Sequence, residues 1–391
     1  MKDVYIVSMA RTPVGGLSGS LASVTAIELG KTVVKAALER AGVNGDQIDE
    51  VYLGNVLQAN VGQAPAQQVS IAAGINTKTP CTTINKVCAS GMKAIMLGAQ
   101  SIMLGDNEVV VVGGMESMSN APHYLPTGRT GIRYGNGEIL DAISRDGLQD
   151  PYKKYMMGNA GEVCAKHYSF SREEQDAYAI SSYKRVQESY ANGYFKDEIV
   201  PVTVKTRKGE ELISEDEDYK KFDEGKVASL KPAFEKDGTI TAFNAPGIND
   251  GASAMVLMSG EKVKELGVKP LAKILGFADA SQEPEWFTTT PSKAIPKALN
   301  KANVKIEDVD LFEINEAFSV VALANMKELN ITHDKINVLG GAVALGHPIG
   351  ASGCRIVGTL ISALNHKGGK IGAAGICNGG GGASAIVIEK V

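Results

Sequence analysis

The first residue whose type and position could do chemistry is Cys88, in the segment Asn85-Lys86-Val87-Cys88-Ala89-Ser90-Gly91. The run that follows is apolar on nearly every face, which predicts a buried helix with Cys88 in its first turn. Unpaired N–H groups and the positive end of the helix dipole would then lower the pKa of the thiol to within about 3.5–7.5. Cys88 is therefore a candidate nucleophile. The alternative is a small buried apolar residue, which most free cysteines are.

A second candidate, His347, lies in a glycine-lined bend over residues 340–353, just before another helix-like run. Pro348 fixes the turn, and the glycines leave the backbone side open to a ligand. The imidazole could act as a base or as an oxyanion donor. A satisfied structural histidine is the alternative reading.

Two more segments carry residues of a useful type. Cys377 ends a β-rich run and precedes Asn378 and four glycines, residues 379–382. Their N–H groups could form an oxyanion hole or a phosphate cradle, and a plain tight turn is the alternative. The Lys and Ser/Thr of a P-loop are missing. Asn315 follows a strand-like stretch and could orient a water or a substrate oxygen, or else cap a turn or helix.

The elements that must position these residues form two similar halves, because the sequence repeats itself at domain length. Three matches keep one order and nearly one shift: 37–38 with 298–299 at 261, 89–91 with 351–353 at 262, and 109–114 with 371–376 at 262. Helical stretches alternate with β-rich strands, which predicts an α/β fold with helix-covered sheets. The predicted domains are 1–118 with 249–269, an inserted loop domain over 119–248, and 270–391.

The inserted region is rich in glycine, asparagine and charged residues. Ser171 followed by Glu174 is a capping-box pattern and predicts a helix over 172–191. Alternating valines over 200–204, followed by Lys208-Gly209, predict a hairpin or an extended arm. The charged run 215–221 is interpreted as a solvated face.

Composition narrows the class of protein. The chain has 391 residues, 44% hydrophobic and 21% charged, with a formal charge of −4, so neither disorder nor a nucleic-acid or anionic-membrane partner is expected. Five scattered cysteines without a CxxC pair favour neither a disulfide framework nor a zinc site. The N-terminus has no basic leader, and no window holds 18 uncharged apolar residues. We expect a cytoplasmic protein, or a mitochondrial-matrix one if a targeting segment was removed.

The motifs VCASG, NEAF, GHPIGASG and CNGGGG, in this order, resemble the thiolase family over essentially the whole chain. The acetyl-CoA acetyltransferase branch is the most similar. The resemblance implies a duplicated thiolase fold, two similar halves in a layered αβαβα arrangement. It also implies reversible Claisen condensation of two acetyl-CoA to acetoacetyl-CoA and CoA through an acetyl-cysteine. CoA thioesters would be the substrates, with no tightly bound cofactor, and a homotetramer or dimer is expected by analogy.

Two other enzyme activities and one non-enzymatic class are alternatives to acetoacetyl-CoA thiolase activity. A broader 3-ketoacyl-CoA thiolase that accepts 2-methylacetoacetyl-CoA is the alternative within the family. A decarboxylating ketoacyl synthase would carry a Cys-His-His or Cys-His-Asn set, and the second cysteine of CNGGGG argues against it. A non-catalytic acyl-CoA or lipid carrier would not need intact Cys88, His347 and Cys377.

The family's roles carry over to matching residues. Cys88 matches the nucleophile, and His347 matches the histidine that activates it and helps to bind the thioester oxygen. Cys377 matches the acid/base that removes a proton from the second acetyl-CoA. Asn315 resembles the residue that holds an oxyanion-hole water, and the N–H groups of Cys88 and Gly379 resemble a second hole. This agrees with the chemistry, since a thiolate is both nucleophile and leaving group and carbanion formation needs a separate base.

The resemblance also implies binding positions for CoA. Met156 stands where many members carry histidine, Phe243 replaces a small residue, and Pro246 stands where a serine usually helps to hold pantetheine. These departures affect the placement of CoA and not the reaction. The implied substrate and CoA positions are Leu148, Met156, Met157, Ala242, Phe243, Pro246, Gly247, Phe287, Ala317 and Phe318.

A potassium ion is a further implication. Phe287 resembles an aromatic residue that shapes the acyl pocket in the mitochondrial acetoacetyl-CoA thiolase branch, although Thr288 departs from the proline typical there. That branch uses potassium. The corresponding positions here are Tyr152, Ala242, Phe243, Ala245 and Val343.

Overall fold

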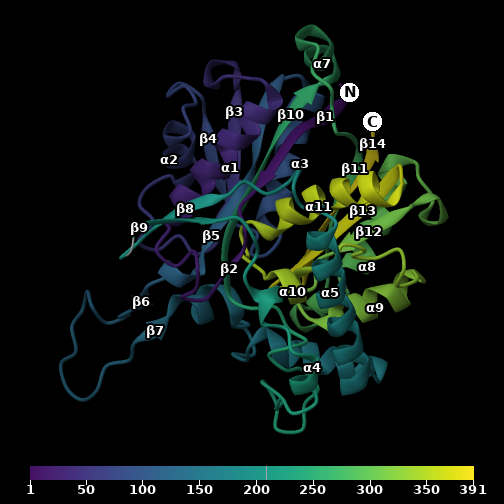
Figure 1. Ribbon diagram of the computed structural model, residues 1–391. Coiled ribbons are helices and arrows are strands. Elements are labelled where there is room, and N and C mark those ends of the chain that lie inside the picture. Colours follow the sequence, from purple (N-terminus) through teal and green to yellow (C-terminus); the bar gives the residue numbers. More distant parts are fainter. Residues whose placement is uncertain (208) are drawn as a thin grey trace.

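The computed structural model describes residues 1–207 and 209–391, so Lys208 of the predicted hairpin lies outside the described residues. A mixed sheet forms the centre of the molecule (Figure 1), with strand order β12-β13-β14-β11-β1-β10-β5-β3-β4 and β2 paired to β10. The strands are β1 (Val4–Arg11), β2 (Gly15–Gly16), β3 (Glu50–Gly54), β4 (Cys81–Ile84), β5 (Val109–Ser117), β10 (Asn249–Ser259), β11 (Ala272–Ser281), β12 (Leu311–Ile314), β13 (Ile371–Asn378) and β14 (Gly382–Lys390).

The sheet consists of two matching halves that meet between β1 and β11. Outward from this seam, β1-β10-β5-β3 and β11-β14-β13-β12 repeat the same orientations: antiparallel, antiparallel, then parallel. The seam itself pairs residues 4–6 with residues 272–274. The internal repeat of the sequence is thus a repeat of topology, and the predicted duplicated α/β fold is confirmed.

Helices cover the sheet in layers. The helices α3 (Ser90–Leu104) and α11 (Ser352–Lys367) pack against each other between the two halves, which is why both are apolar on nearly every face. The outer faces are covered by α1 (Ala26–Ala41) and α2 (Pro65–Ala72) on one half and by α8 (Pro291–Ala302) on the other. The arrangement is the predicted αβαβα stack.

One segment, Val87–Leu104, is long and apolar enough to pass a test for a membrane-spanning helix. It includes α3, and 61% of it is buried inside the fold. A core helix of a soluble domain has the same composition, so this finding is weak support for a membrane span.

The insertion leaves the sheet at the end of β5 and returns at the start of β10 (Figure 1). Its helix α5 (Arg172–Ala191) begins at the capping box of Ser171 and Glu174, as predicted. Its other elements are β6 (His123–Tyr124), β7 (Leu140–Asp141), a π-helical turn (Ile143–Leu148), α4 (Met157–Tyr168), β8 (Val202–Thr206), β9 (Gly209–Ile213) and α6 (Glu224–Val227). Three helices follow elsewhere: α7 (Gly260–Leu266), α9 (Ser319–Leu329) and α10 (Ala342–Leu345).

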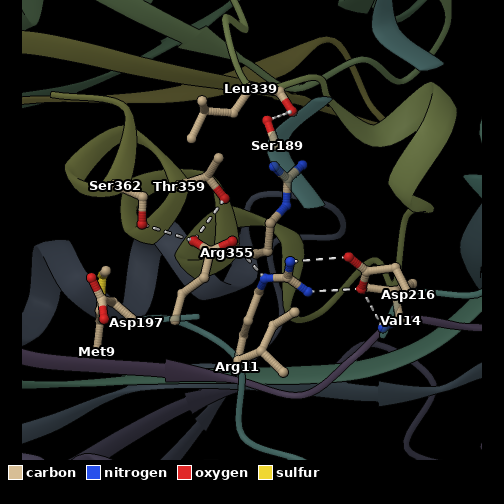
Figure 2. Close-up of polar contacts among 12 residues, drawn as sticks. Met9, Arg11, Val14, Ser189, Asp197, Asp216, Leu339, Arg355, Thr359 and Ser362 are labelled. Atoms are coloured by element: carbon tan, nitrogen blue, oxygen red, sulfur yellow. Dashed lines mark hydrogen bonds and ion pairs between the residues drawn. The ribbon is translucent and has the colours of Figure 1, made fainter. Parts of the chain in front are cut away.

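The interpretation of residues 215–221 as a solvated face is wrong at Asp216. This carboxylate is fully buried and accepts hydrogen bonds from both terminal nitrogens of Arg11, at 2.8 and 3.0 Å (Figure 2). Arg11 Nε donates a third bond, of 2.9 Å, to the buried Glu198. Buried charges persist only when they are paired, so this part of the run anchors the insertion to β1. Residues such as Lys220, 50% exposed, do face solvent.

Candidate active site

Cys88 lies in a tight turn between β4 and α3. The helix begins at Ser90 with Ala89 as its N-cap, so the expectation that Cys88 sits in the first helical turn is wrong. Its sulfur accepts hydrogen bonds from the backbone N–H groups of Gly379 and of Cys88 itself. Burial outweighs these bonds and raises the pKa of the thiol to about 12, opposite to the predicted direction. The side chain still opens partly onto a cavity. In the resting protein Cys88 is therefore a thiol that needs a base.

His347 lies between α10 and α11 and is held on both sides. Ser352 Oγ donates its proton to the carbonyl of Pro348 at 3.0 Å, so its 2.7 Å contact with His347 Nδ1 makes Nδ1–H the donor. The lone pair is then on Nε2, 3.4 Å from the amide nitrogen of Asn315. Burial, aided by the charge of Arg355, lowers the pKa of His347 to about 3. A neutral imidazole whose lone pair is on Nε2 can accept a proton there.

Asn315 faces the site and is not a helix cap. It follows β12, and its backbone N–H donates to the carbonyl of Gly375 at 2.9 Å, while α9 begins only at Ser319. Its side-chain oxygen is buried and has no partner among the residues that the structure describes. Because an unpaired buried oxygen is costly, a ligand or water is the expected donor to it.

Cys377 ends β13 beside a turn that needs glycine. Gly380 and Gly381 have φ of +86° and +84°, and a Cβ on Gly381 would lie 2.2 Å from the carbonyl of Gln282. This turn brings the N–H of Gly379 to the sulfur of Cys88. Cys377 is 1% exposed, and burial, with the neighbouring Cys88, raises the pKa of its thiol. The five residues from four distant motifs thus gather at one place.

These groups surround an apolar cavity of about 320 Å³ into which Cys88, His347 and Gly379 open. Nine of the ten predicted substrate and CoA positions line it: Leu148, Met156, Met157, Ala242, Pro246, Gly247, Phe287, Ala317 and Phe318. The tenth, Phe243, is not among the lining residues. Its ring stacks on Tyr183 and Phe222, with ring centres 5.0 and 5.8 Å away.

Sequence patterns did not indicate eight of the lining residues, six of which lie in weakly patterned stretches of the insertion. Phe234 is the largest of them, and its ring meets Phe318 edge-on at 5.9 Å. A Cβ on Gly158 would lie 2.2 Å from that ring, so Gly158 makes room for it. The sequence offered one signal of this close approach, which is that Gly158 directly follows the predicted Met157. The missed residues are Met118, Gly147, Gly158, Ala233, Phe234, Thr241, Ile248 and Ile349.

The five implied potassium positions differ in their burial and surroundings. Ala242 and Ala245 line the cavity, whereas Phe243 and Val343 pack in the apolar core. Tyr152 is 74% exposed and lines a neighbouring hollow with Gly147 and Gly379. Four of the five are alanine, phenylalanine or valine, which have no side-chain oxygen, so a potassium ion here would be held by their backbone carbonyls, which hard cations accept as ligands.

Comparison with protein families matches residues 4–261 to the thiolase N-terminal domain and residues 268–390 to the thiolase C-terminal domain. The chain belongs to the thiolase family. The acetyl-CoA acetyltransferase of Schizosaccharomyces pombe is 55% identical, covering 100% of this chain and 99% of the relative. The acetyl-CoA acetyltransferase ERG10, cytosolic, of Gibberella zeae is 54% identical, also over 100% and 99%.

Solved structures agree with this assignment. The Acat5 thiolase of Ascaris suum, in complex with coenzyme A, superposes with a TM-score of 0.95 at 49% identity and covers 100% of both chains. The acetyl-CoA acetyltransferase of Bacillus anthracis gives a TM-score of 0.98 at 43% identity, over 100% of this chain and 99% of that one.

Proposed function

We propose that this thiolase is an acetyl-CoA acetyltransferase that condenses two acetyl-CoA to acetoacetyl-CoA and CoA, and catalyses the reverse thiolysis. The observation that carries the proposal is one apolar cavity bounded by Cys88, His347 and Gly379. Asn315 contacts the imidazole, and Cys377 lies next to Cys88. The names of the relatives support the same activity.

The first half-reaction moves an acetyl group to Cys88. His347 Nε2 takes the thiol proton as the sulfur attacks the thioester carbon. Cys377 gives its proton to the departing CoA thiolate. The products are acetyl-Cys88, free CoA, an imidazolium and a Cys377 thiolate. Asn315 and the protonated His347 then face one oxyanion, and the N–H groups of Cys88 and Gly379 face the acyl oxygen of the acetylated sulfur.

The second half-reaction makes the carbon–carbon bond. The Cys377 thiolate removes a methyl proton from a second acetyl-CoA, and the resulting enolate carbon attacks acetyl-Cys88. The Cys88 thiolate leaves and regains its proton from His347. A raised thiol pKa suits Cys377 to this role, because burial keeps it protonated at rest and makes its thiolate a strong base.

Two cysteine variants test this division of labour. Cys88→Ala should abolish the acetyl adduct seen by intact-protein mass spectrometry with acetyl-CoA, because the sulfur that accepts the acetyl group is removed. Cys377→Ala should still form the adduct but lose condensation by at least about 100-fold, since general acid–base groups contribute 10²–10⁴-fold. Equal loss of acetylation and condensation in Cys377→Ala would contradict the separate roles of the two cysteines. Binding of acetyl-CoA by the wild type without an adduct would favour a non-catalytic acyl-CoA carrier.

The substrate range rests on Phe287, which is 3% exposed and lines the cavity from a 3₁₀ segment (Pro284–Thr289). Phe287 belongs to the same apolar cluster as Cys377, which supports a position at the acyl end of the cavity, where a 2-methyl group would lie against the ring. Comparing thiolysis of acetoacetyl-CoA, its 2-methyl analogue and longer 3-ketoacyl-CoAs tests this. The same assays in potassium and in sodium test the potassium hypothesis.

Association and location are also proposals. We infer a homo-oligomer, a tetramer or a dimer, supported by the segment between β6 and β7, which carries the exposed apolar side chains of Leu125, Ile132, Tyr134 and Ile139. Light scattering of the wild type and of a variant with polar residues there tests it. A cytosolic location is supported by the name of one relative.

A further inference from the structure

The turn that carries Cys88 is strained. Val87 has φ of +47°, a left-handed conformation that a β-branched residue rarely adopts and that costs about 1–3 kcal/mol. Bonds inside the turn support it: Asn85 Oδ1 accepts from the N–H of Val87 at 3.0 Å, and Ser90 Oγ donates to the carbonyl of Val87 at 2.6 Å. Such a conformation persists only when surrounding groups hold it.

Lys86 ties this turn to the opposite half of the molecule. Its ammonium group donates to Asp279 Oδ1 at 2.7 Å, to Ser384 Oγ at 2.7 Å and to the carbonyl of Ala383 at 3.2 Å. Asp279 lies on β11, and the other two partners lie on β14. All three ammonium protons therefore have acceptors on two strands of the second half.

The position of these partners links Lys86 to the second cysteine. Ala383 is the direct cross-strand partner of Cys377, and Ser384 is that of Ile376. Gly379, whose N–H contacts the Cys88 sulfur, lies in the turn between β13 and β14. The Lys86 side chain thus connects the nucleophile's turn to the residues that carry the other reacting groups.

We propose that Lys86 is a positioning residue that holds the strained turn of Cys88 in register with Cys377 and Gly379. The inference rests on the proposed roles of these groups. Lys86 itself does not line the cavity, so it acts through the placement of the Cys88 sulfur. Misplacement of a reacting atom by about 1 Å can cost 10²-fold in rate.

Lys93 is a matched control, because it pairs with the other oxygen of the same carboxylate. Its ammonium lies 2.8 Å from Asp279 Oδ2, and the side chains of Lys86 and Lys93 are both 25% exposed. Lys93 lies within α3, beyond the strained turn. The variants Lys86→Met and Lys93→Met therefore remove similar ion pairs and differ in their link to Cys88.

The test is single-turnover acetylation of Cys88, steady-state condensation and thermal unfolding of both variants in the full-length enzyme. Lys86→Met should lower acetylation and kcat about 10–100-fold, as for other supporting-residue changes, with KM for acetyl-CoA within about 2-fold. Lys93→Met should keep near wild-type rates at a similar Tm. Lys86→Arg, which keeps the cation, should recover part of the loss.

Equal rates in the two methionine variants would overturn the inference, as would a loss in Lys86→Met that appears in KM alone or follows the unfolded fraction. If either of these overturning results were found while the wild type still formed acetyl-Cys88, the proposed function would stand and only the positioning role of Lys86 would be lost. Wild-type enzyme that forms no acetyl-Cys88 would overturn both.

Discussion

At the scale of single residues, the neighbours and the burial of His347 and Cys88 determine which protonation states these two side chains can adopt. Ser352 and Asn315 hold the two nitrogens of His347 and leave Nε2 as the acceptor. Burial keeps His347 neutral and Cys88 protonated, so the proton must move as the sulfur attacks. A resting thiolate–imidazolium pair is therefore not expected in this enzyme.

Ser352→Ala should slow acetylation of Cys88 by about 10–100-fold, the usual effect of removing a group that orients a functional imidazole. Without the Ser352 hydroxyl, the tautomer with its proton on Nε2 becomes accessible, and that tautomer cannot accept the thiol proton. Rapid-quench mass spectrometry measures the rate, and Ser352→Thr, which keeps the hydroxyl, is the control. An unchanged rate in Ser352→Ala would show that Asn315 alone orients the ring.

Glu116 should make stability fall as pH rises through neutrality. It is fully buried, and burial raises its pKa to about 7 despite N–H bonds from Leu57, Val56 and Gly350. Since its unfolded pKa is about 4.3, the fold binds this proton more tightly. The stabilisation that the protonated Glu116 gives the fold is complete below about pH 4.3 and is lost as pH rises to about 7.

Thermal unfolding of Glu116→Gln at pH 5 and pH 8 checks this. The glutamine variant cannot ionise, so the difference in Tm between the two pH values should be smaller than in the wild type. An identical difference would show that Glu116 does not titrate in this range.

At the scale of elements, close approaches place the turns of the site. Gly340, before α10, has φ of +86°, and a Cβ there would lie 2.3 Å from Val186 and 2.7 Å from the carbonyl of Ser182 on α5. The helix of the insertion therefore rests directly on the backbone that leads to His347. Gly267, at the end of α7, has φ of +64° but no atom within 4 Å of its Cβ position.

Gly340→Ala should be clearly more destabilising than Gly267→Ala. Both substitutions place a Cβ in a left-handed conformation, which costs roughly 1 kcal/mol. Gly340→Ala adds a clash with α5 and about 1–3 kcal/mol more. Urea unfolding followed by fluorescence measures the difference. Equal midpoints would mean that α5 moves aside at little cost.

At the scale of the whole molecule, buried charges join the insertion to the duplicated core. Arg11 on β1 bonds Asp216 (Figure 2) and also bonds Glu198, and both acceptors belong to the insertion. The insertion also supplies much of the cavity lining. The half-sheets position the cysteines and the histidine, and this network positions the surface that faces the substrate.

Arg11→Met should destabilise the protein by about 3–5 kcal/mol, because it leaves two buried carboxylates without their partner. Lys35→Met is the control, since Lys35 and Glu39 form an exposed pair at 4.0 Å that contributes about 0.5 kcal/mol or less. Urea unfolding gives both values, and limited proteolysis should cut Arg11→Met earlier within residues 119–248. Equal stability of the two variants would contradict the anchoring role.

The sequence by itself determined the repeat, the α/β class, the α5 helix and the four motifs that meet at the cavity. These follow from local patterns: a self-match at domain length, a capping box at Ser171, and glycines around His347 and after Cys377. Nine of ten substrate positions also followed from the resemblance. The helix and the motifs are each encoded within a short stretch of chain, whereas the repeat is read from the comparison of two long stretches.

Only the tertiary structure decided the protonation of Cys88, the burial of Asp216 and the packing of Phe243 in the core instead of in the cavity wall. Each depends on groups distant in the chain: Gly379 for the thiol, Arg11 for the carboxylate, and Tyr183 and Phe222 for the ring. Desolvation arises from packing, and packing is a property of the folded whole. No local pattern could therefore have shown that Cys88 rests as a thiol.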